Sequence, residues 1–314
     1  MVIYKISDIS IRNKQTYNVQ PPHKKNFIVS LAKKRHDAND KTTKCFFNPN
    51  ENETKYGKQL ISEPTRRGKR NVITTIKFTP NIKFDSFDKI VFDSCVSQFV
   101  EGYNAASLRM IHRLITGKIE NKYTNLSPTV MNDIFNSINK LTTTDILIDA
   151  TDVCAALGYN NSEPFKRKNK ILPAEIINAQ ICNNDSTVLS FTGLPPLYEL
   201  ATLRHRRKKS GGQILSYPVD LLDVPNTKNS IVEIKIKNHT LRRILECNHS
   251  ELSNHVRFDE IILSTGINII TKWQMQDLRN YIESLLNYWQ QKNLFSQYEL
   301  LKKDRKYYGF AIHF

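Results

Sequence analysis

The stretch YELLKKDRKYYGFAIHF, residues 298–314, decides the fold because it predicts a β-hairpin with a basic tip. Every second residue from Tyr308 to Phe314 is apolar or aromatic, which is the period of a strand with one face on a core. Cations crowd the predicted turn: Lys302, Lys303, Arg305 and Lys306. Lysine there is compatible with a solvated loop that discourages aggregation as well as with a phosphate contact. The residues before the hairpin decide between these interpretations.

A long amphipathic helix is predicted immediately before the hairpin, over residues 271–293. Apolar side chains recur along it every three or four residues from Met275 to Trp289, and Thr271 can cap its start. Its other face is polar, with the candidate DNA-contacting residues Lys272, Gln274, Gln276, Arg279 and Asn280. Asn, Gln and Arg make bidentate contacts with base edges, so this face is a candidate for reading DNA.

Three helices followed by strands are also predicted in the middle of the chain. Asp85 and Asp88 at capping-box spacing open a helix that ends near Gly102, and a second helix covers residues 105–116. Ser127 and Pro128 open the third. The predicted strands cover residues 72–78, 145–150, 174–182 and 186–191. Three helices and a hairpin are the order of a winged helix, whose third helix enters a major groove, so Asn132, Asn136 and Lys140 are further candidates.

We therefore predict an α+β fold with two winged-helix domains in tandem and a basic, partly disordered N-terminal arm. The predicted segments are a flexible arm over 1–71, a first winged-helix domain over 72–193, a linker with a basic loop over 194–227 and a second winged-helix domain over 228–314. The linker loop is equally compatible with a solvated turn and with phosphate contacts. Its candidate residues are Arg204, Arg206, Arg207, Lys208 and Lys209.

Net charge points to a polyanionic partner. The 314 residues carry a formal charge of +16, of which +11 falls on residues 1–80 and +7 on residues 201–314. Five cysteines, odd in number and far apart, form no zinc-finger pattern, and the start has no signal-peptide character. No apolar run reaches membrane-spanning length. We expect a reduced, cytoplasmic protein without a metal or cofactor.

The sequence resembles the replication initiator proteins of bacterial plasmids and mobile elements. Three stretches carry the resemblance: FDKIVFDSCVSQFVEGYN and the helices after it, PPLYELA with its return to QILSYPVDLLDV, and NLFSQYELLKKDRKYYGFAIHF. The resemblance implies a C-terminal winged helix that grips repeats in double-stranded origin DNA, and a first winged helix that forms a homodimer and adds DNA contacts. It also implies recruitment of the host replicative helicase or its loader, and repression of the protein's own gene.

Two other functions compete with origin binding. A winged-helix transcription regulator or partition protein would use the same binding physics. A metal-dependent nuclease would need a strand at NSIVEIKIK, residues 229–237, with Glu233 and Lys235 on it and Asp220 and Asp223 upstream. The alternative reading of that segment is the first helix of the second winged helix.

Motifs for other chemistry are missing from the sequence. No Walker or GxGxxG motif occurs, so neither a helicase motor nor a dinucleotide site has support. A nicking enzyme would need a close histidine pair beside Tyr307 or Tyr308, but the eight histidines are scattered. We therefore predict that the protein is not an enzyme.

Overall fold

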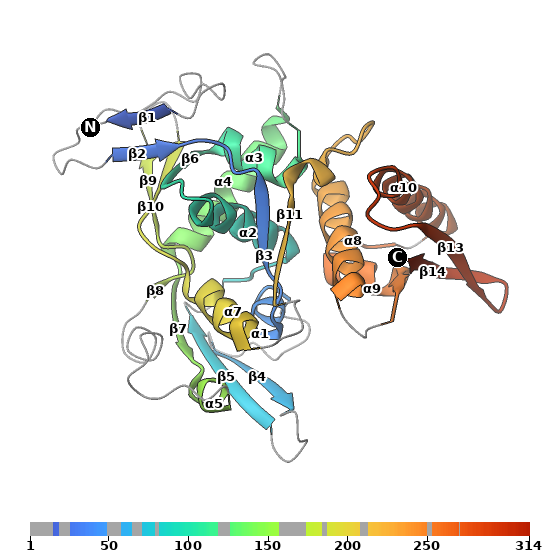
Figure 1. The fold of residues 1–314 in the computed structure, drawn as a ribbon, viewed down its shortest axis with the longest axis horizontal. Coiled ribbons are helices and arrows are strands. Elements are labelled where there is room, and N and C mark those ends of the chain that lie inside the picture. Colours follow the sequence, from blue (N-terminus) through green and yellow to red (C-terminus); the bar gives the residue numbers. More distant parts are fainter. Residues whose placement is uncertain are drawn as a thin grey trace.

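The computed structural model describes most of the chain. The described residues are 15–18, 26–48, 58–64, 71–78, 82–118, 126–156, 174–183, 187–207, 213–249, 253–269 and 271–314. They form an α+β fold in which two units of winged-helix order lie side by side, the first around α2 and the second around α8 (Figure 1).

The C-terminal unit has the complete element order of a winged helix. Its elements are α8 (Ile231–His249), β12 (His255–Arg257), α9 (Phe258–Thr265), α10 (Lys272–Gln291), β13 (Gln297–Lys303) and β14 (Lys306–His313). The strands form an antiparallel sheet in the order β12-β14-β13. The predicted final helix and basic hairpin are both confirmed, and the short strand β12 had no periodic signal in the sequence.

Local sequence explains the shape of this unit. Thr271 and Gln274 form a reciprocal capping box at the start of α10, which satisfies backbone donors that the helix leaves free. The hairpin turns at Asp304 and Arg305, which both adopt positive φ, as a tight two-residue hairpin turn requires. Gly309 lets β14 approach β12, because a Cβ there would lie 2.4 Å from the carbonyl oxygen of Val256. Phe314, predicted on the core face, is instead 49% exposed because it lies beyond the end of β14.

The first unit repeats this order with an insertion. Its elements are α2 (Ser86–Val100), β6 (Ala105–Ser107), α3 (Leu108–Thr116), α4 (Pro128–Thr143), β9 (Ala179–Asn183) and β10 (Thr187–Phe191). The sheet order β6-β10-β9 matches that of the second unit. Between α4 and β9 lie β7 (Asp145–Asp149), α5 (Thr151–Ala156) and β8 (Ala174–Glu175). Strands β7 and β8 complete a four-stranded sheet with β4 (Lys58–Pro64) and β5 (Asn71–Phe78).

The predicted caps of the first unit are largely confirmed. Asp85 and Asp88 form the predicted capping box of α2, and α3 ends at Gly117, which adopts the left-handed region. Gly117 also lies against the backbone of Asp223, where a Cβ would come within 2.2 Å of the amide nitrogen. Pro128 occupies the first turn of α4, but the Ser127 side chain makes no capping hydrogen bond.

The prediction of a flexible arm over residues 1–71 is wrong for its second half. Strand β3 (Lys34–Ala38) is buried against α2, and helix α1 (Lys41–Phe46) is buried against the later helix over Pro196–Arg207 and the strand Lys58–Pro64, although the segment is highly polar. Arg35 and Asp37 are almost fully buried and pair at 2.8 Å, and Asp37 also accepts a hydrogen bond from the hydroxyl of Tyr217. Polar residues can be buried when they satisfy each other in this way. Strands β1 (Gln15–Asn18) and β2 (Asn26–Val29) pair with each other, and residues 1–14 lie outside the described part of the chain.

The predicted linker over residues 194–227 is also wrong. It contains α7 (Pro196–Arg207), β11 (Ile214–Pro218) and the short 3-10 helix η2 (Val219–Leu222). Strand β11 pairs with β3, so the supposed arm and linker form one antiparallel ribbon beside α2. Leu197, Leu215 and Leu222 are buried, which explains why the segment is ordered despite its paired prolines.

Direct contacts join the two units. Lys235 of α8 pairs with Asp85 at 2.6 Å, and Glu246 of α8 pairs with Lys44 of α1 at 2.5 Å. Lys237 of α8 is fully buried and donates to the carbonyl oxygen of Thr116 at the end of α3. The two units of winged-helix order therefore share an interface and are not joined by a linker alone.

The strand interpretation of residues 229–237 is wrong, because residues 231–249 form helix α8. Glu233 lies in its first turn and Lys235 pairs with Asp85. Asp220 lies in η2 and Asp223 follows it. The nuclease alternative depended on a strand that this segment does not form.

Buried histidines predict a loss of stability in acid. Burial first, and nearby positive charge second, lower the pKa of His112 to about 4 and that of His239 to about 3. A histidine in the unfolded chain has a pKa of about 6.5. As the pH falls below that value, the two histidines become protonated in the unfolded chain but stay neutral in the folded chain, and this favours unfolding. Burial raises the pKa of Asp93 to about 6, which acts in the opposite direction but for one group only. The free energy of unfolding should fall by about 2 kcal/mol between pH 7 and pH 5, measured by urea unfolding.

A His112→Gln variant is the control for this prediction. Most of its pH dependence should disappear, since one of the two histidines no longer titrates and Asp93 opposes the other. A variant that keeps the full pH dependence would show that other groups cause the acid sensitivity.

Candidate nucleic-acid interface

The polar face of α10 presents side chains that can read base edges. Gln274, Gln276 and Asn280 are exposed, and Arg279 is half-buried. The side-chain amide of Gln276 donates to the side-chain oxygen of Asn280 at 2.7 Å, which orders the two side chains on one face. The opposite face, from Leu278 to Trp289, is buried in the core of the unit. Core packing therefore fixes which face of α10 is presented outward.

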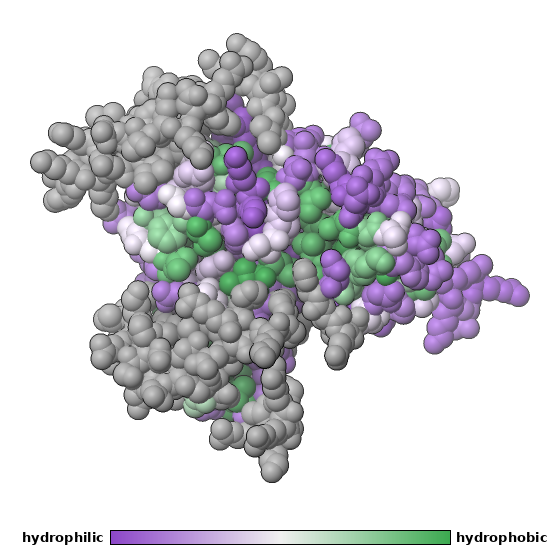
Figure 2. Space-filling model, viewed as in Figure 1, coloured by the Kyte–Doolittle hydropathy of each residue, from purple (hydrophilic) through white to green (hydrophobic). Residues whose placement is uncertain are grey.

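The tip of the β13–β14 hairpin carries unpaired positive charge. Lys302, Lys303, Arg305 and Lys306 are all exposed. Outside the backbone pairing of the two strands, the side chains of these residues form no ion pair or hydrogen bond in the described part of the chain. The hairpin projects from the body of the molecule, and its surface is hydrophilic where it extends beyond α10 (Figures 1 and 2). These cations are therefore available to a phosphate backbone.

Tyr307 joins the hairpin to α10. Its ring lies under two cations, with the Arg279 guanidinium 4.7 Å and the Lys302 ammonium 5.4 Å from its centroid. Cation–π contacts of this kind hold both side chains in place. The structure thus brings a predicted base-reading residue and a predicted phosphate-contacting residue to the same aromatic ring.

Acidic residues limit the extent of this surface. Asp277 and Glu283 also lie on α10, and Glu299 lies near the start of β13 with a contact to His313. At the start of α9, Arg257 is held by Asp259 at 2.5 Å, so it is already paired. The cationic surface is therefore restricted to the first half of α10 and the hairpin tip.

The first unit offers fewer of its predicted contacts. Asn132 and Asn136 are exposed on α4. Lys140 is instead paired with Asp88 at 2.5 Å, and its ammonium lies 5.3 Å from the ring centroid of Phe84. The ion pair of Lys140 joins α4 to the start of α2, so this lysine is a poor candidate for a phosphate contact.

Helix α7, which carries three of the basic residues of the predicted linker, lies apart from α10 (Figure 1). Arg204, Arg206 and Arg207 are in the last turns of α7. Lys208 and Lys209 lie outside the described residues. The three arginines of α7 are therefore not part of the surface formed by α10 and the hairpin.

Two aromatic residues of the surface were missed in the sequence. Trp273 is 81% exposed in the first turn of α10, and Tyr307 is 44% exposed beside the hairpin tip. The signal for Trp273 was its position outside the apolar stripe that begins at Met275, because a tryptophan off the core face of a helix is unusual. Tyr307 likewise has the opposite parity to the core-facing residues of its strand.

Comparisons with known proteins add little to this description. No family model and no curated protein matches the chain. Among solved structures, a crystal structure of domains 2–3 of RctB covers 83% of this chain and 92% of its own, with a TM-score of 0.40 and 11% sequence identity. A likeness of this level carries no argument about function. No helix in the described part of the chain is long and apolar enough to cross a membrane.

Proposed function

We propose that this protein is a sequence-specific binder of double-stranded DNA, with α10 in a major groove and the β13–β14 hairpin on the adjacent backbone. The observation that supports this most directly is Tyr307, which places Arg279 of α10 and Lys302 of the hairpin against one ring. In winged-helix proteins the third helix and the hairpin are the two DNA-contacting elements. Here both carry the required side chains on one continuous surface.

The two parts of the surface have different tasks in this proposal. The hairpin cations neutralise phosphates and release counterions, which gives affinity for any duplex. Gln276, Arg279 and Asn280 contact base edges, which gives preference for one sequence. The exposed ring of Trp273 supplies an apolar contact at the start of the helix, where thymine methyl groups are accessible in a major groove.

The biological role that we propose is the start of replication of a plasmid or mobile element by binding repeats at its origin. This part rests on the sequence resemblance to replication initiators and on the tandem order of two winged-helix units. The first unit would form a homodimer and add contacts through Asn132 and Asn136, and the host helicase or its loader would be recruited. The proposed role includes no catalytic step, and autorepression follows if a repeat overlaps the promoter.

The first test is binding to labelled duplex from the region flanking the gene, compared with a scrambled duplex over a series of salt concentrations. Fluorescence anisotropy should show tight, site-dependent binding without magnesium and a steep salt dependence. Equal weak binding to both duplexes would contradict sequence-specific recognition. Binding of copies to one another on two adjacent repeats would then be measured by ultracentrifugation.

The two tryptophans provide an internal reference for the same experiment. Trp273 is 81% exposed on the proposed surface, whereas Trp289 is fully buried in the core. Specific duplex should protect Trp273 from iodide quenching, and a Trp273→Phe variant should show almost no quenching with or without DNA. Unchanged quenching on saturation with specific duplex would place the DNA elsewhere on the protein.

Replacing Gln276 with Ala should reduce discrimination between sites rather than general affinity. A bidentate contact with a base contributes about 1–3 kcal/mol of discrimination, so affinity for the specific duplex should fall about tenfold while affinity for scrambled duplex stays nearly constant. Gln290 near the end of α10 is the matched control, because it donates to the Ser296 carbonyl oxygen within its own unit. An equal loss on both duplexes would contradict base reading by Gln276.

A further inference from the structure

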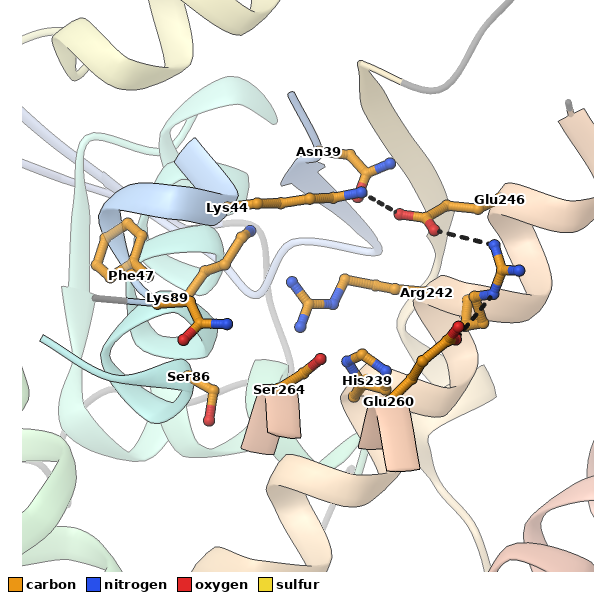
Figure 3. A pocket seen from close by; sticks show the side chains of 12 residues that line it. Asn39, Lys44, Phe47, Ser86, Lys89, His239, Arg242, Glu246, Glu260 and Ser264 are labelled. Carbon is orange, nitrogen blue, oxygen red and sulfur yellow. Dashed lines mark hydrogen bonds and ion pairs between the residues drawn. The ribbon is translucent and has the colours of Figure 1, made fainter. Parts of the chain in front are cut away.

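A cavity of about 300 Å³ lies between the two winged-helix units, where α1 and α2 face α8 and α9 (Figure 3). This volume lies at the lower end of the range for small-molecule sites in proteins. Its walls come from both units, with Lys44 and Lys89 on one side and Arg242 and Arg243 on the other. The cavity is separate from the surface of α10 and the hairpin, since it contains none of their residues.

Arg242 is the residue that makes this cavity chemically unusual. Its side chain is only 9% exposed, and Figure 3 shows its guanidinium group pointing into the cavity toward Lys89. The Nε atom donates to the carbonyl oxygen of Asn238 at 3.4 Å. The two terminal nitrogens have no hydrogen-bond or ion-pair partner among the described residues. A buried guanidinium with free donors needs a counter-charge.

The cavity's own carboxylates are already neutralised. Glu246 pairs with Lys44 at 2.5 Å and with Arg243 at 3.7 Å, and Glu260 lies 3.8 Å from Arg243. Lys89 is held by Asp93 at 2.6 Å. Of the cations lining the cavity, Arg242 is therefore the one whose terminal nitrogens have no partner among the residues that the structure describes.

The acids behind Arg242 are occupied as well. Asp37 accepts hydrogen bonds from Arg35 and from the Tyr217 hydroxyl. Asp93 accepts from Lys89 and from the backbone N–H of Ala38. Their charges act on Arg242 at a distance, but they do not bind its terminal nitrogens. The positive potential of Arg242 is therefore directed into the cavity.

Neutral hydrogen-bonding groups surround this charge. Ser86, Ser264 and Asn48 line the cavity, together with His239, whose pKa is lowered to about 3 by burial and by Arg242, so that its imidazole stays neutral. A tetrahedral phosphate group suits such a site, because its oxygens accept from an arginine fork and from donors in several other directions. The ring of Phe47 forms part of the wall and leaves an apolar surface for the rest of a ligand.

We propose that this cavity binds a small phosphorylated ligand of mononucleotide size, with its phosphate on Arg242. The ligand contacts α1 and α2 of one unit and α8 and α9 of the other, so binding favours the arrangement in which the units are packed together. This site is independent of the proposed DNA surface.

The test is thermal unfolding of the full chain with inorganic phosphate, AMP, dTMP and, as the uncharged comparison, adenosine, all at constant ionic strength. Phosphate and a mononucleotide should raise Tm by several degrees at a hundredfold excess over Kd, about the shift expected for one bound ligand, and adenosine should not. An Arg242→Gln variant should bind at least tenfold more weakly by calorimetry while its affinity for specific duplex stays unchanged. An Arg305→Gln variant should show the reverse.

Two further measurements separate the possible failures. A Ser264→Phe variant fills the cavity without removing a charge and should also lose the ligand, which covers the case in which Arg242→Gln does not fold. The proposal is overturned if phosphate and nucleotides leave Tm unchanged, or if the shift persists in both variants. Displacement of the nucleotide by short duplex would assign the cavity to a DNA phosphate and would likewise overturn it.

Discussion

Replacing Lys302, Lys303, Arg305 and Lys306 together with Ala is expected to weaken binding to every duplex by about a hundredfold or more near physiological salt. The four side chains are exposed and form no ion pair among the described residues, and the one contact of Lys302 is with the exposed ring of Tyr307, so removing them should not disturb the fold. Each phosphate contact adds about 0.9 to the salt slope, so the slope should fall by roughly 3 to 4. Anisotropy titrations over a salt series on specific and scrambled duplex measure both quantities.

A matched variant removes the same charge elsewhere. Lys33, Lys34, Lys58 and Lys77 are exposed lysines on or beside β3, β4 and β5, away from the hairpin. Their replacement with Ala changes the net charge equally and should alter the salt slope by less than about 1. Similar losses in the two variants would mean that total charge, and not the hairpin, determines affinity.

The helices and strands that could be predicted are those for which the capping or turn residues and the spacing of apolar residues indicate the same element. In α10 the cap at Thr271 and the stripe from Met275 to Trp289 indicate the same helix, and the structure has it. The hairpin was predictable because its turn is polar and because large apolar residues occupy every second position of its second strand. Strands β6 and β12 have only three residues each, which is too short for a period to be detected.

The ribbon of β3 and β11 could not be predicted because its burial is polar. Hydrophobic periodicity identifies a core face only when the buried residues are apolar. Arg35 and Asp37 have the correct alternation for one face of a strand, but they are buried as a pair and depend on Tyr217, 180 residues later. The hydrogen bond between Asp37 and Tyr217 forms only in the folded chain, so no local pattern in the sequence indicates it.

The candidate site shows the same division. Gln276 and the four hairpin cations follow from the residue types that DNA recognition requires. The role of Lys140 could not be predicted from its residue type, because its ion pair with Asp88 exists only when α4 packs on α2. The cavity around Arg242 was equally hidden, since its lining comes from four helices in two units.

Replacing Lys237 with Ala is expected to lower the free energy of unfolding by about 3–5 kcal/mol. The ammonium group donates to the carbonyl oxygens of Thr116 and Leu222, at 2.9 and 2.7 Å, and to the side-chain oxygen of Asn229 at 3.0 Å. Burial, and then Lys118, lower its pKa to about 7, yet all three of its donors are used. Alanine would leave a cavity and would take the Lys237 donor away from three buried oxygens, of which the Asn229 oxygen still accepts from the Thr227 hydroxyl. Urea unfolding followed by circular dichroism measures the change.

Lys235, two residues earlier on α8, is the matched control. It also joins the units, but its partner Asp85 is 55% exposed, so Lys235→Ala should cost less than about 1 kcal/mol. The number of transitions is equally informative. Because Lys237 connects α8 to the end of α3, its loss should separate one cooperative transition into two, whereas the Lys235→Ala variant should still unfold in one. A single unshifted transition in the Lys237→Ala variant would show that the hydrophobic contacts of α8 with α2 are sufficient to couple the units.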